Sequence, residues 1–225
     1  MDMAYIVSIW LLPILVAITF HEAAHAYAAR FLGDDTASRL GRVSLNPVRH
    51  IDPFGTILLP ALLLFARSPF LFGYAKPVPV NFRALRNPRM GMVLVAAAGP
   101  AMNIALAIVA ALSFHLVVYL PATAARWTAL NLKNALVINV ILAVFNLFPL
   151  PPLDGGRIAV GVLPGFLGRQ LARLERYGMI ILIALLILLP MLGARLGVDL
   201  SFVSHAISRA TNAVLAVILR LTGNI

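Results

Sequence analysis

Five apolar stretches constrain the fold of this chain more than any other feature, because each is a candidate for a helix that crosses a lipid bilayer. A helix needs about 20 residues to span a hydrocarbon core of about 30 Å. A helix also satisfies its backbone hydrogen bonds internally, which the bilayer interior demands. We therefore predict an all-α polytopic membrane protein with about five to six transmembrane helices. The stretches cover residues 4–30, 90–120, 135–150, 177–192 and 202–221.

The composition supports a membrane protein and argues against two other classes. Of the 225 residues, 61% are apolar and 12% are charged, whereas a soluble domain has about 45–50% and about 25%. The net charge of +10 could suit nucleic acid, but the arginines are scattered between apolar runs and form no basic face. The chain has no cysteine, so histidine, aspartate and glutamate remain as candidate metal ligands.

The basic residues beside the apolar stretches predict the orientation, because cytoplasmic loops carry an excess of Lys and Arg. With the N-terminus outside, 14 of these residues lie on the cytoplasmic side and 3 lie outside. Residues 30–89, residues 157–176 and Arg220 then face the cytoplasm, and residues 121–127 form an outer loop. A shorter apolar piece, residues 54–66, is interrupted by a proline; we interpret it as re-entrant or interfacial, with a full span as the alternative.

The first long loop contains two further patterns. Residues 42–46 (RVSLN) alternate between polar and apolar side chains, which is the periodicity of a strand. They predict a short membrane-associated β element after the first helix. Residues 74–89 are rich in Pro, Asn and Arg, which predicts a loop. The sequence shows no repeat, so we expect a single integral membrane domain over residues 1–225.

The sequence HEAAH at residues 21–25 is the strongest chemical signal in the chain. His21 and His25 are four residues apart, so they share one helix face and can bind one metal ion. Glu22 lies beside them, where a carboxylate can take a proton from water. The spacing suits zinc. The alternative, an interfacial cluster without a metal, leaves three adjacent ionisable residues in an apolar helix unexplained.

A catalytic zinc ion needs at least one more protein ligand and one open position. Asp154 is the leading candidate, because three prolines interrupt the helix before it and two glycines follow it. Such breaks open the backbone and mark sites in membrane proteins. The other candidates are Asp34, Asp35, Asp52, Glu175, His50, His115 and His205.

Three motifs resemble the signatures of the site-2 protease family of intramembrane zinc metalloproteases. They are HEAAH at residues 21–25, GPAMN at residues 99–103 and NLFPLPPLDGG at residues 146–156. Their order and their membrane setting match as well. The resemblance covers about residues 5–160, and the first and third motifs together are highly specific.

The resemblance implies an enzyme, a zinc metalloendopeptidase, with Zn²⁺ as its cofactor. His21, His25 and Asp154 would bind the ion, and Glu22 would be the general base. It also implies a protease core at residues 5–160.

The resemblance further implies which residues contact a substrate. In the family, a β element after the zinc helix contacts the substrate and the asparagine of the third motif helps to hold it. Val43, Ser44 and Asn146 take those places here. For Asn103 the sequence leaves two roles open, substrate contact and helix packing. The expected partners are a single-span membrane-protein substrate and the lipid bilayer, with no nucleic acid, and the oligomeric state stays open.

We expect this chain to differ from better-known relatives of the family in two ways, with no PDZ insert between the second and third motifs and no C-terminal CBS domains. The C-terminal helices, within residues 177–221, would be accessory to the core. We expect an integral protein of the cell (inner) membrane of a prokaryote, with its active site near the cytoplasmic face.

The predicted function is regulated intramembrane proteolysis, the hydrolysis of a peptide bond in or near a transmembrane helix of another protein. The alternative is a zinc-holding membrane scaffold or a metal transporter without proteolytic activity. A transporter needs ionisable groups along a path across the bilayer, and the outer halves of these stretches contain almost none. Glu22 favours the hydrolase, because a scaffold has no need of a carboxylate beside its ligands.

Overall fold

The computed structural model describes residues 2–58, 62, 65 and 76–225. Five helical stretches of this part are long and apolar enough to cross a membrane, which agrees with the prediction of about five to six transmembrane helices. They are α1 (Met3–Phe31), α4 (Pro88–Ser113) with its extension η4 (Phe114–Tyr119), α5 (Ala122–Asn146), the continuous run of α8 (Glu175–Ile183), η5 (Ala184–Leu188) and α9 (Leu189–Leu196), and α10 (Phe202–Leu221).

Helix α5 is longer than its apolar stretch. It begins at Ala122, whereas the prediction covered residues 135–150, because charged and amide side chains lower the hydropathy of its first half without breaking the helix. One of these amides joins α5 to α1: Asn134 Nδ2 donates to the carbonyl oxygen of Ile9 at 2.8 Å. The predicted outer loop at residues 121–127 is therefore helical from Ala122 onward.

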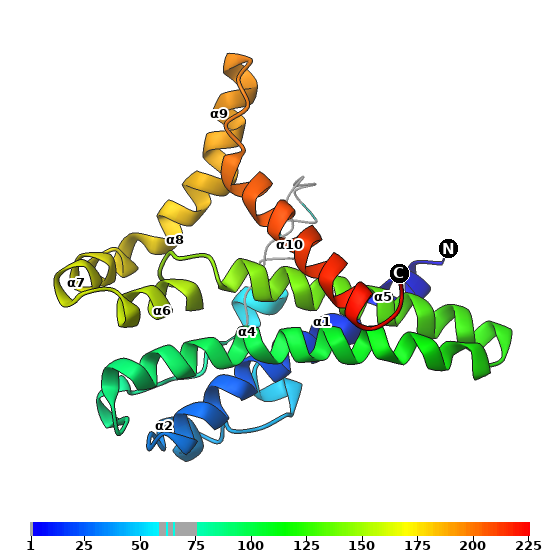
Figure 1. Ribbon diagram of the computed structural model, residues 1–225, viewed down its shortest axis with the longest axis horizontal. Coiled ribbons are helices and arrows are strands. Elements are labelled where there is room, and N and C mark those ends of the chain that lie inside the picture. Colours follow the sequence, from blue (N-terminus) through cyan, green and yellow to red (C-terminus); the bar gives the residue numbers. More distant parts are fainter. Residues whose placement is uncertain (1, 59–61, 63–64, 66–75) are drawn as a thin grey trace.

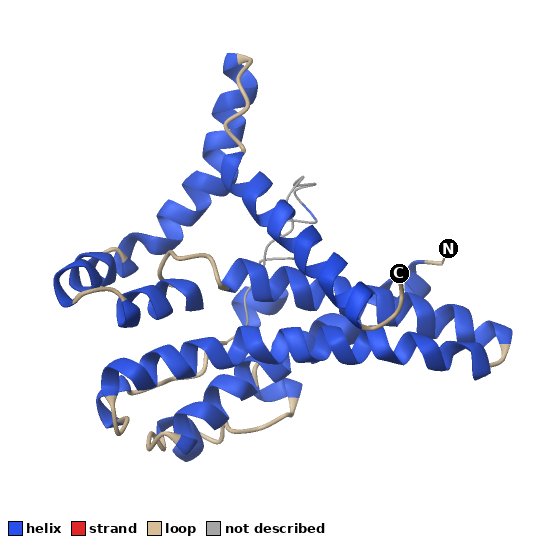
Figure 2. Ribbon diagram, in the orientation of Figure 1, coloured by secondary structure: helices blue, strands red, loops and turns tan. Residues whose placement is uncertain are grey.

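Short helices fill the connections, and no strand occurs among the described residues (Figure 2). The β element predicted at residues 42–46 is therefore wrong. Its polar groups bond locally: Ser44 Oγ accepts from Asn46 N–H at 3.1 Å, and His50 Nε2 donates to the Ser44 carbonyl at 2.7 Å. Bonds of this kind compete with strand pairing.

The short helices are α2 (Thr36–Arg39), η1 (Pro47–Arg49), η2 (Pro53–Leu58), η3 (Phe82–Ala84), α6 (Asp154–Val162) and α7 (Gly165–Arg173). Most of the predicted re-entrant piece, residues 54–66, lies outside the described residues; its first part belongs to η2.

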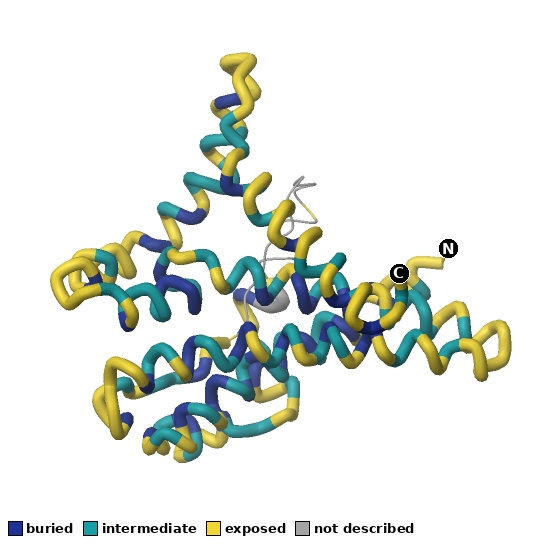
Figure 3. Tube along the Cα trace, viewed as in Figure 1, coloured by how far each residue is buried: buried dark blue, intermediate teal, exposed yellow. Residues whose placement is uncertain are grey.

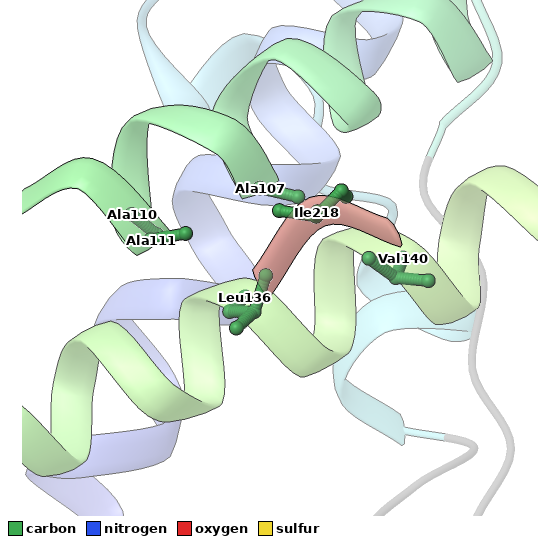
Figure 4. Close-up of a cluster of buried hydrophobic side chains, with 6 residues drawn as sticks. All are labelled: Ala107, Ala110, Ala111, Leu136, Val140 and Ile218. Atoms are coloured by element: carbon green, nitrogen blue, oxygen red, sulfur yellow. The ribbon is translucent and has the colours of Figure 1, made fainter. Parts of the chain in front are cut away.

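Helices α1, α4 and α5 pack side by side as the central bundle, with α6 and α7 at the end where α5 finishes (Figure 1). Buried residues concentrate in this bundle, whereas the ends of the molecule are mostly exposed (Figure 3). Small side chains on α4 let α5 and α10 approach closely. The resulting apolar cluster is Ala107, Ala110, Ala111, Leu136, Val140 and Ile218 (Figure 4).

The run α8–η5–α9 leaves the bundle as an arm, and α10 returns to it (Figure 1). The C-terminal end of α10 lies beside the end of α4 that the charge pattern places outside. There His115 Nε2 donates to the carbonyl oxygen of Thr222 at 2.7 Å, and Asn224 Nδ2 donates to that of Ala111 at 3.0 Å. The prediction that Arg220 faces the cytoplasm with the other basic residues is therefore wrong. It assumed that each apolar helix crosses the full bilayer in turn, whereas α10 follows its packing partners.

Candidate metal centre

Helix α1 presents two histidines to the interior of the bundle. His21 and His25 are one turn apart on the same face, and both are buried. Their rings meet edge to face with centroids 4.7 Å apart. The two Nε2 atoms are 3.1 Å apart, so both point to the same place.

Hydrogen bonds to α4 fix the orientation of both imidazoles. His25 Nδ1 lies 2.7 Å from the carbonyl oxygen of Val95. Because a carbonyl oxygen only accepts, Nδ1 carries the proton and Nε2 keeps its lone pair in the neutral ring. His21 Nδ1 lies 2.6 Å from Oδ1 of Asn103, which leads to the same tautomer. Metal-binding histidines are usually held in this way by a second partner.

Asp154 reaches the same place from the start of α6. It is the first residue of that helix, after the proline-rich loop that follows α5, and it is buried. Gly155 and Gly156 make this approach possible, because a Cβ on either would overlap the loop backbone at Leu147 or Pro151. The break in the helix predicted from the prolines and glycines therefore does bring a carboxylate into the bundle.

The three side chains fit a zinc ion. Asp154 Oδ2 lies 3.2 Å from His21 Nε2 and 3.3 Å from His25 Nε2. Ligand atoms around tetrahedral zinc, with bonds of about 2.0–2.1 Å, are about 3.3 Å apart. Among the described residues Asp154 Oδ2 has no hydrogen-bond donor, so a carboxylate oxygen and two imidazole lone pairs converge as the ligands of a metal ion do.

Helix α4 crosses this cluster at Gly99. A Cβ at that position would overlap Nε2 of His25 and would lie 2.6 Å from Cε1 of His21, whereas ordinary contacts are 3.4–4 Å. Glycine is therefore required for the close approach of α4 to the two rings. The sequence marked Gly99 as part of a motif, but it gave no sign of this steric reason.

Asn103 lies one turn further along α4 and is wholly buried. Its Oδ1 faces His21, and its Nδ2 donates to Oδ1 of Asn139 on α5 at 2.7 Å. Asn139 in turn donates to the carbonyl of Ala135 at 2.8 Å. The structure therefore places Asn103 behind a candidate ligand, not at a surface where it could meet a substrate. Of the two roles that the sequence left open, this place favours helix packing.

Glu22 lies outside the three-ligand cluster, and a loop segment holds it in place. Its Oε2 accepts from the N–H of Val78 at 2.9 Å. Val78 belongs to residues 76–81, which we call the strap. Pro77 and Pro79 in the strap have no N–H, so this segment cannot form a complete strand ladder. The sequence predicted a loop here, but nothing in its composition indicated contact with Glu22.

A cavity of about 480 Å³ opens beside the cluster. His21, Glu22, His25 and Asp154 line one part of it, and Pro77, Val78 and Val80 of the strap line another. Most of the remaining wall is apolar and comes from α1, α5, the loop before α6, and α8. Its apolar residues include Ile18, Leu142, Phe145, Leu153, Met179 and Leu182.

The other predicted substrate contacts are divided between the cavity and its surroundings. Asn146 lines the cavity. Val43 packs against the buried cluster that contains Val78, and Ser44 bonds within its own loop, so neither lines the cavity. Sequence reasoning missed Phe82 and Arg157, which do line it. In the described part of the chain, three potential metal ligands lie close together: His21, His25 and Asp154. None of the other candidate ligands lies in this group.

A helical membrane bundle with these residues at its centre has the architecture of an integral membrane zinc metalloprotease. The sequence model of peptidase family M50 matches residues 117–189. The chain is 42% identical over 197 residues to "Putative zinc metalloprotease YwhC" of Bacillus subtilis, which covers 81% of this chain and 85% of that protein. It is also 30% identical over 201 residues to "Putative zinc metalloprotease Rip2" of Mycobacterium tuberculosis (strain H37Rv), across 87% of this chain and 75% of the relative.

These similarities establish the family. The chain belongs to peptidase family M50, the site-2 protease family of zinc metalloproteases, and zinc is its cofactor. No solved structure matches the chain.

Proposed function

We propose that this protein hydrolyses a peptide bond in or beside a transmembrane helix of another membrane protein, as a step of regulated intramembrane proteolysis. One observation carries the proposal. The carboxylate of Glu22 and the cluster of His21, His25 and Asp154 line the same cavity, and that cavity lies among the helices that are long enough to cross a membrane.

The residues of the cavity have distinct roles in this mechanism. His21, His25 and Asp154 would hold the zinc ion, which would supply the Lewis acidity that polarises a scissile carbonyl and acidifies a water molecule. Glu22 is the general base. Its Oε2 is held by the N–H of Val78, which leaves Oε1 to accept the proton of the attacking water. Glu22 then returns this proton to the nitrogen of the leaving amine.

The apolar wall of the cavity indicates an apolar substrate segment. A helix keeps its carbonyl groups in internal hydrogen bonds, so the segment must unwind locally before its peptide bond can be attacked. Asn146 offers a polar side chain at the cavity wall and lies near the end of α5, where a substrate carbonyl or amide can bond to it. We infer that a single-span protein is the substrate, because one isolated helix can enter and unwind more easily than a helix packed in a bundle.

The charge pattern supports a location in the cell membrane with the active site near the cytoplasm. The cluster lies toward the end of α1 that is followed by the arginine-rich loops, and basic loops stay on the cytoplasmic side. We further propose that residues 1–225 form one protease domain. Met179 and Leu182 of α8 line the cavity, so the helix predicted as accessory takes part in the site.

Fragment analysis tests the proposed function. The wild type and Glu22→Gln are co-expressed with a panel of tagged single-span proteins, and fragments that only the wild type produces are sought. The matched control is Glu175→Gln, because Glu175 is the other glutamate of the chain and is paired with Arg157 at 3.6 Å outside the cluster. We expect Glu175→Gln to cleave and Glu22→Gln not to cleave. Equal cleavage by Glu22→Gln and the wild type would refute the hydrolase and favour the zinc-holding scaffold.

A further inference from the structure

The strap is held by side chains and backbone groups of the preceding segment, residues 22–50. The N–H of Val78 donates to Glu22, as described above. Two more contacts fix its ends: the N–H of Lys76 donates to the carbonyl of His50 at 3.0 Å, and the N–H of Asn81 donates to Oδ2 of Asp34 at 2.6 Å. The position of the Val78 N–H, and with it the position of the Glu22 carboxylate, therefore depends on how the strap is anchored.

Arg42 supplies a further anchor, at the start of the strap. Its Nη2 donates to the carbonyl of Lys76 at 2.5 Å and lies 3.5 Å from that of Pro77. The Arg42 side chain is buried, with 6% of the residue exposed, which is rare for arginine unless it has a specific partner. Burial lowers the pKa of the guanidinium, and the charge of Glu22 opposes this shift. The charge of Glu22 therefore acts electrostatically on the Arg42 guanidinium.

We propose that Arg42 is a positioning residue for the general base. It fixes the carbonyls of Lys76 and Pro77, so that the next N–H in the chain, that of Val78, holds Oε2 of Glu22 and leaves Oε1 for the attacking water. The proposal rests on the proposed function, because it assumes that Glu22 accepts a proton. It gives Arg42 a different role from the one expected at first, when the alternating pattern predicted a β element and the family resemblance implied that this element contacts the substrate.

A residue that only supports the fold and a residue that positions the base have different effects. Loss of a structural anchor lowers stability and weakens every property of the site, zinc binding included. Loss of a positioning residue leaves zinc and substrate binding in place and lowers kcat. Removal of a general base typically costs about 10²–10⁴-fold in rate, so a misplaced base should cost less, about tenfold to a hundredfold.

The first experiment compares Arg42→Met with the wild type for one cleaved substrate from the panel. Arg39→Met is the matched control, because Arg39 lies three residues earlier, at the end of α2, and is exposed. We expect Arg42→Met to lose about tenfold to a hundredfold in kcat, with zinc content and KM close to those of the wild type, and Arg42→Lys to recover part of the loss. Arg39→Met should behave as the wild type. An unchanged kcat in Arg42→Met, or a loss of zinc in step with activity, would overturn the proposal.

A second pair of variants tests the hydrogen bond itself and does not require Arg42→Met to fold. Val78→Pro removes the N–H, whereas Val78→Ala trims the same side chain and keeps the N–H. The kcat of Val78→Pro should be at least about tenfold below that of Val78→Ala, at equal zinc content. Equal kcat values would overturn the proposal.

Double variants separate this inference from the proposed function. If Arg42 acts through Glu22, Arg42→Met should add no loss to the residual rate of Glu22→Gln, since changes at residues that act as a unit do not add. A further tenfold loss in the double variant would show that Arg42 acts elsewhere. If Glu22→Gln alone cleaved as the wild type does, the proposed function itself would fail, whatever the Arg42 variants showed.

Discussion

Substitution of Gly99 by alanine should disturb the metal centre without changing any candidate ligand. The added Cβ would lie 2.6 Å from Cε1 of both His21 and His25, and ordinary contacts begin near 3.4 Å. Helix α4 or the two rings must therefore move by about 0.8 Å or more, the difference between these distances. A shift of this size also strains the bonds from His21 to Asn103 and from His25 to Val95. Loss of such supporting bonds typically lowers metal affinity about tenfold to a hundredfold, and overpacking of a core costs about 1–3 kcal/mol in stability.

Competition with a zinc chelator measures this affinity for purified Gly99→Ala and wild type, and thermal unfolding reports the stability. Gly165→Ala is the control, because the closest atom to a Cβ at Gly165 is on the flexible Arg169 side chain at 3.5 Å. We expect Gly165→Ala to bind zinc as the wild type does. Wild-type zinc affinity in Gly99→Ala would refute the reasoning, because it would mean that the close approach of α4 does not determine the geometry of the site.

Three further outcomes follow from the contacts of individual polar side chains. Glu22→Gln should keep zinc and lose about 10²–10⁴-fold in cleavage rate, whereas Asp154→Ala should lose the metal. Metal analysis together with a cleavage assay checks both outcomes. A zinc-free Glu22→Gln protein would contradict the roles assigned to these two residues. Asn139→Leu should weaken zinc binding by about tenfold or more, because it removes the acceptor for the Asn103 amide that supports the imidazole of the candidate ligand His21. Unchanged affinity in chelator competition would exclude this role. Asp34→Asn should lower the free energy of unfolding by about 1–3 kcal/mol, because the amide cannot accept from both Thr36 and the N–H of Asn81 as the carboxylate does. Burial raises the pKa of Asp34, but these hydrogen bonds hold that pKa below its usual value. The stability of the wild type should therefore fall as the pH drops below about 4, whereas the stability of Asp34→Asn should change less. Thermal unfolding at several pH values can measure this difference.

Local patterns in the sequence were sufficient to predict the membrane helices and the group of residues that converges on α1. Hydropathy identifies an apolar helix without reference to its neighbours, and the i, i+4 spacing of His21 and His25 fixes their common face. Asp154 could be selected because prolines and glycines reveal where the helix is broken. Each of these signals lies within a few residues of the feature that it predicts.

The parts that the sequence did not predict depend on contacts between distant segments. Alternation at residues 42–46 suggested a strand, but a strand needs a partner, and Arg42 instead donates to the backbone of Lys76. The role of Asn103 depends on which helix faces it. Asn134 lowers the hydropathy of the first half of α5, but in the fold it bonds to α1. In each case the polar side chain looks the same in the sequence whether it faces a substrate, a lipid headgroup or another helix.

The candidate metal centre would join α1 to the start of α6, two elements that lie far apart in the sequence, with α4 and α5 between them. Zinc that binds the converged ligands more tightly than the unfolded chain stabilises the folded state by mass action. At a free zinc concentration a hundredfold above the dissociation constant, this linkage contributes roughly 2.7 kcal/mol. The available zinc in the cell is thus a thermodynamic effector of folding for this protein as well as a reagent in its chemistry. Chelators present during extraction should therefore lower its resistance to heat and to proteolysis together with its activity.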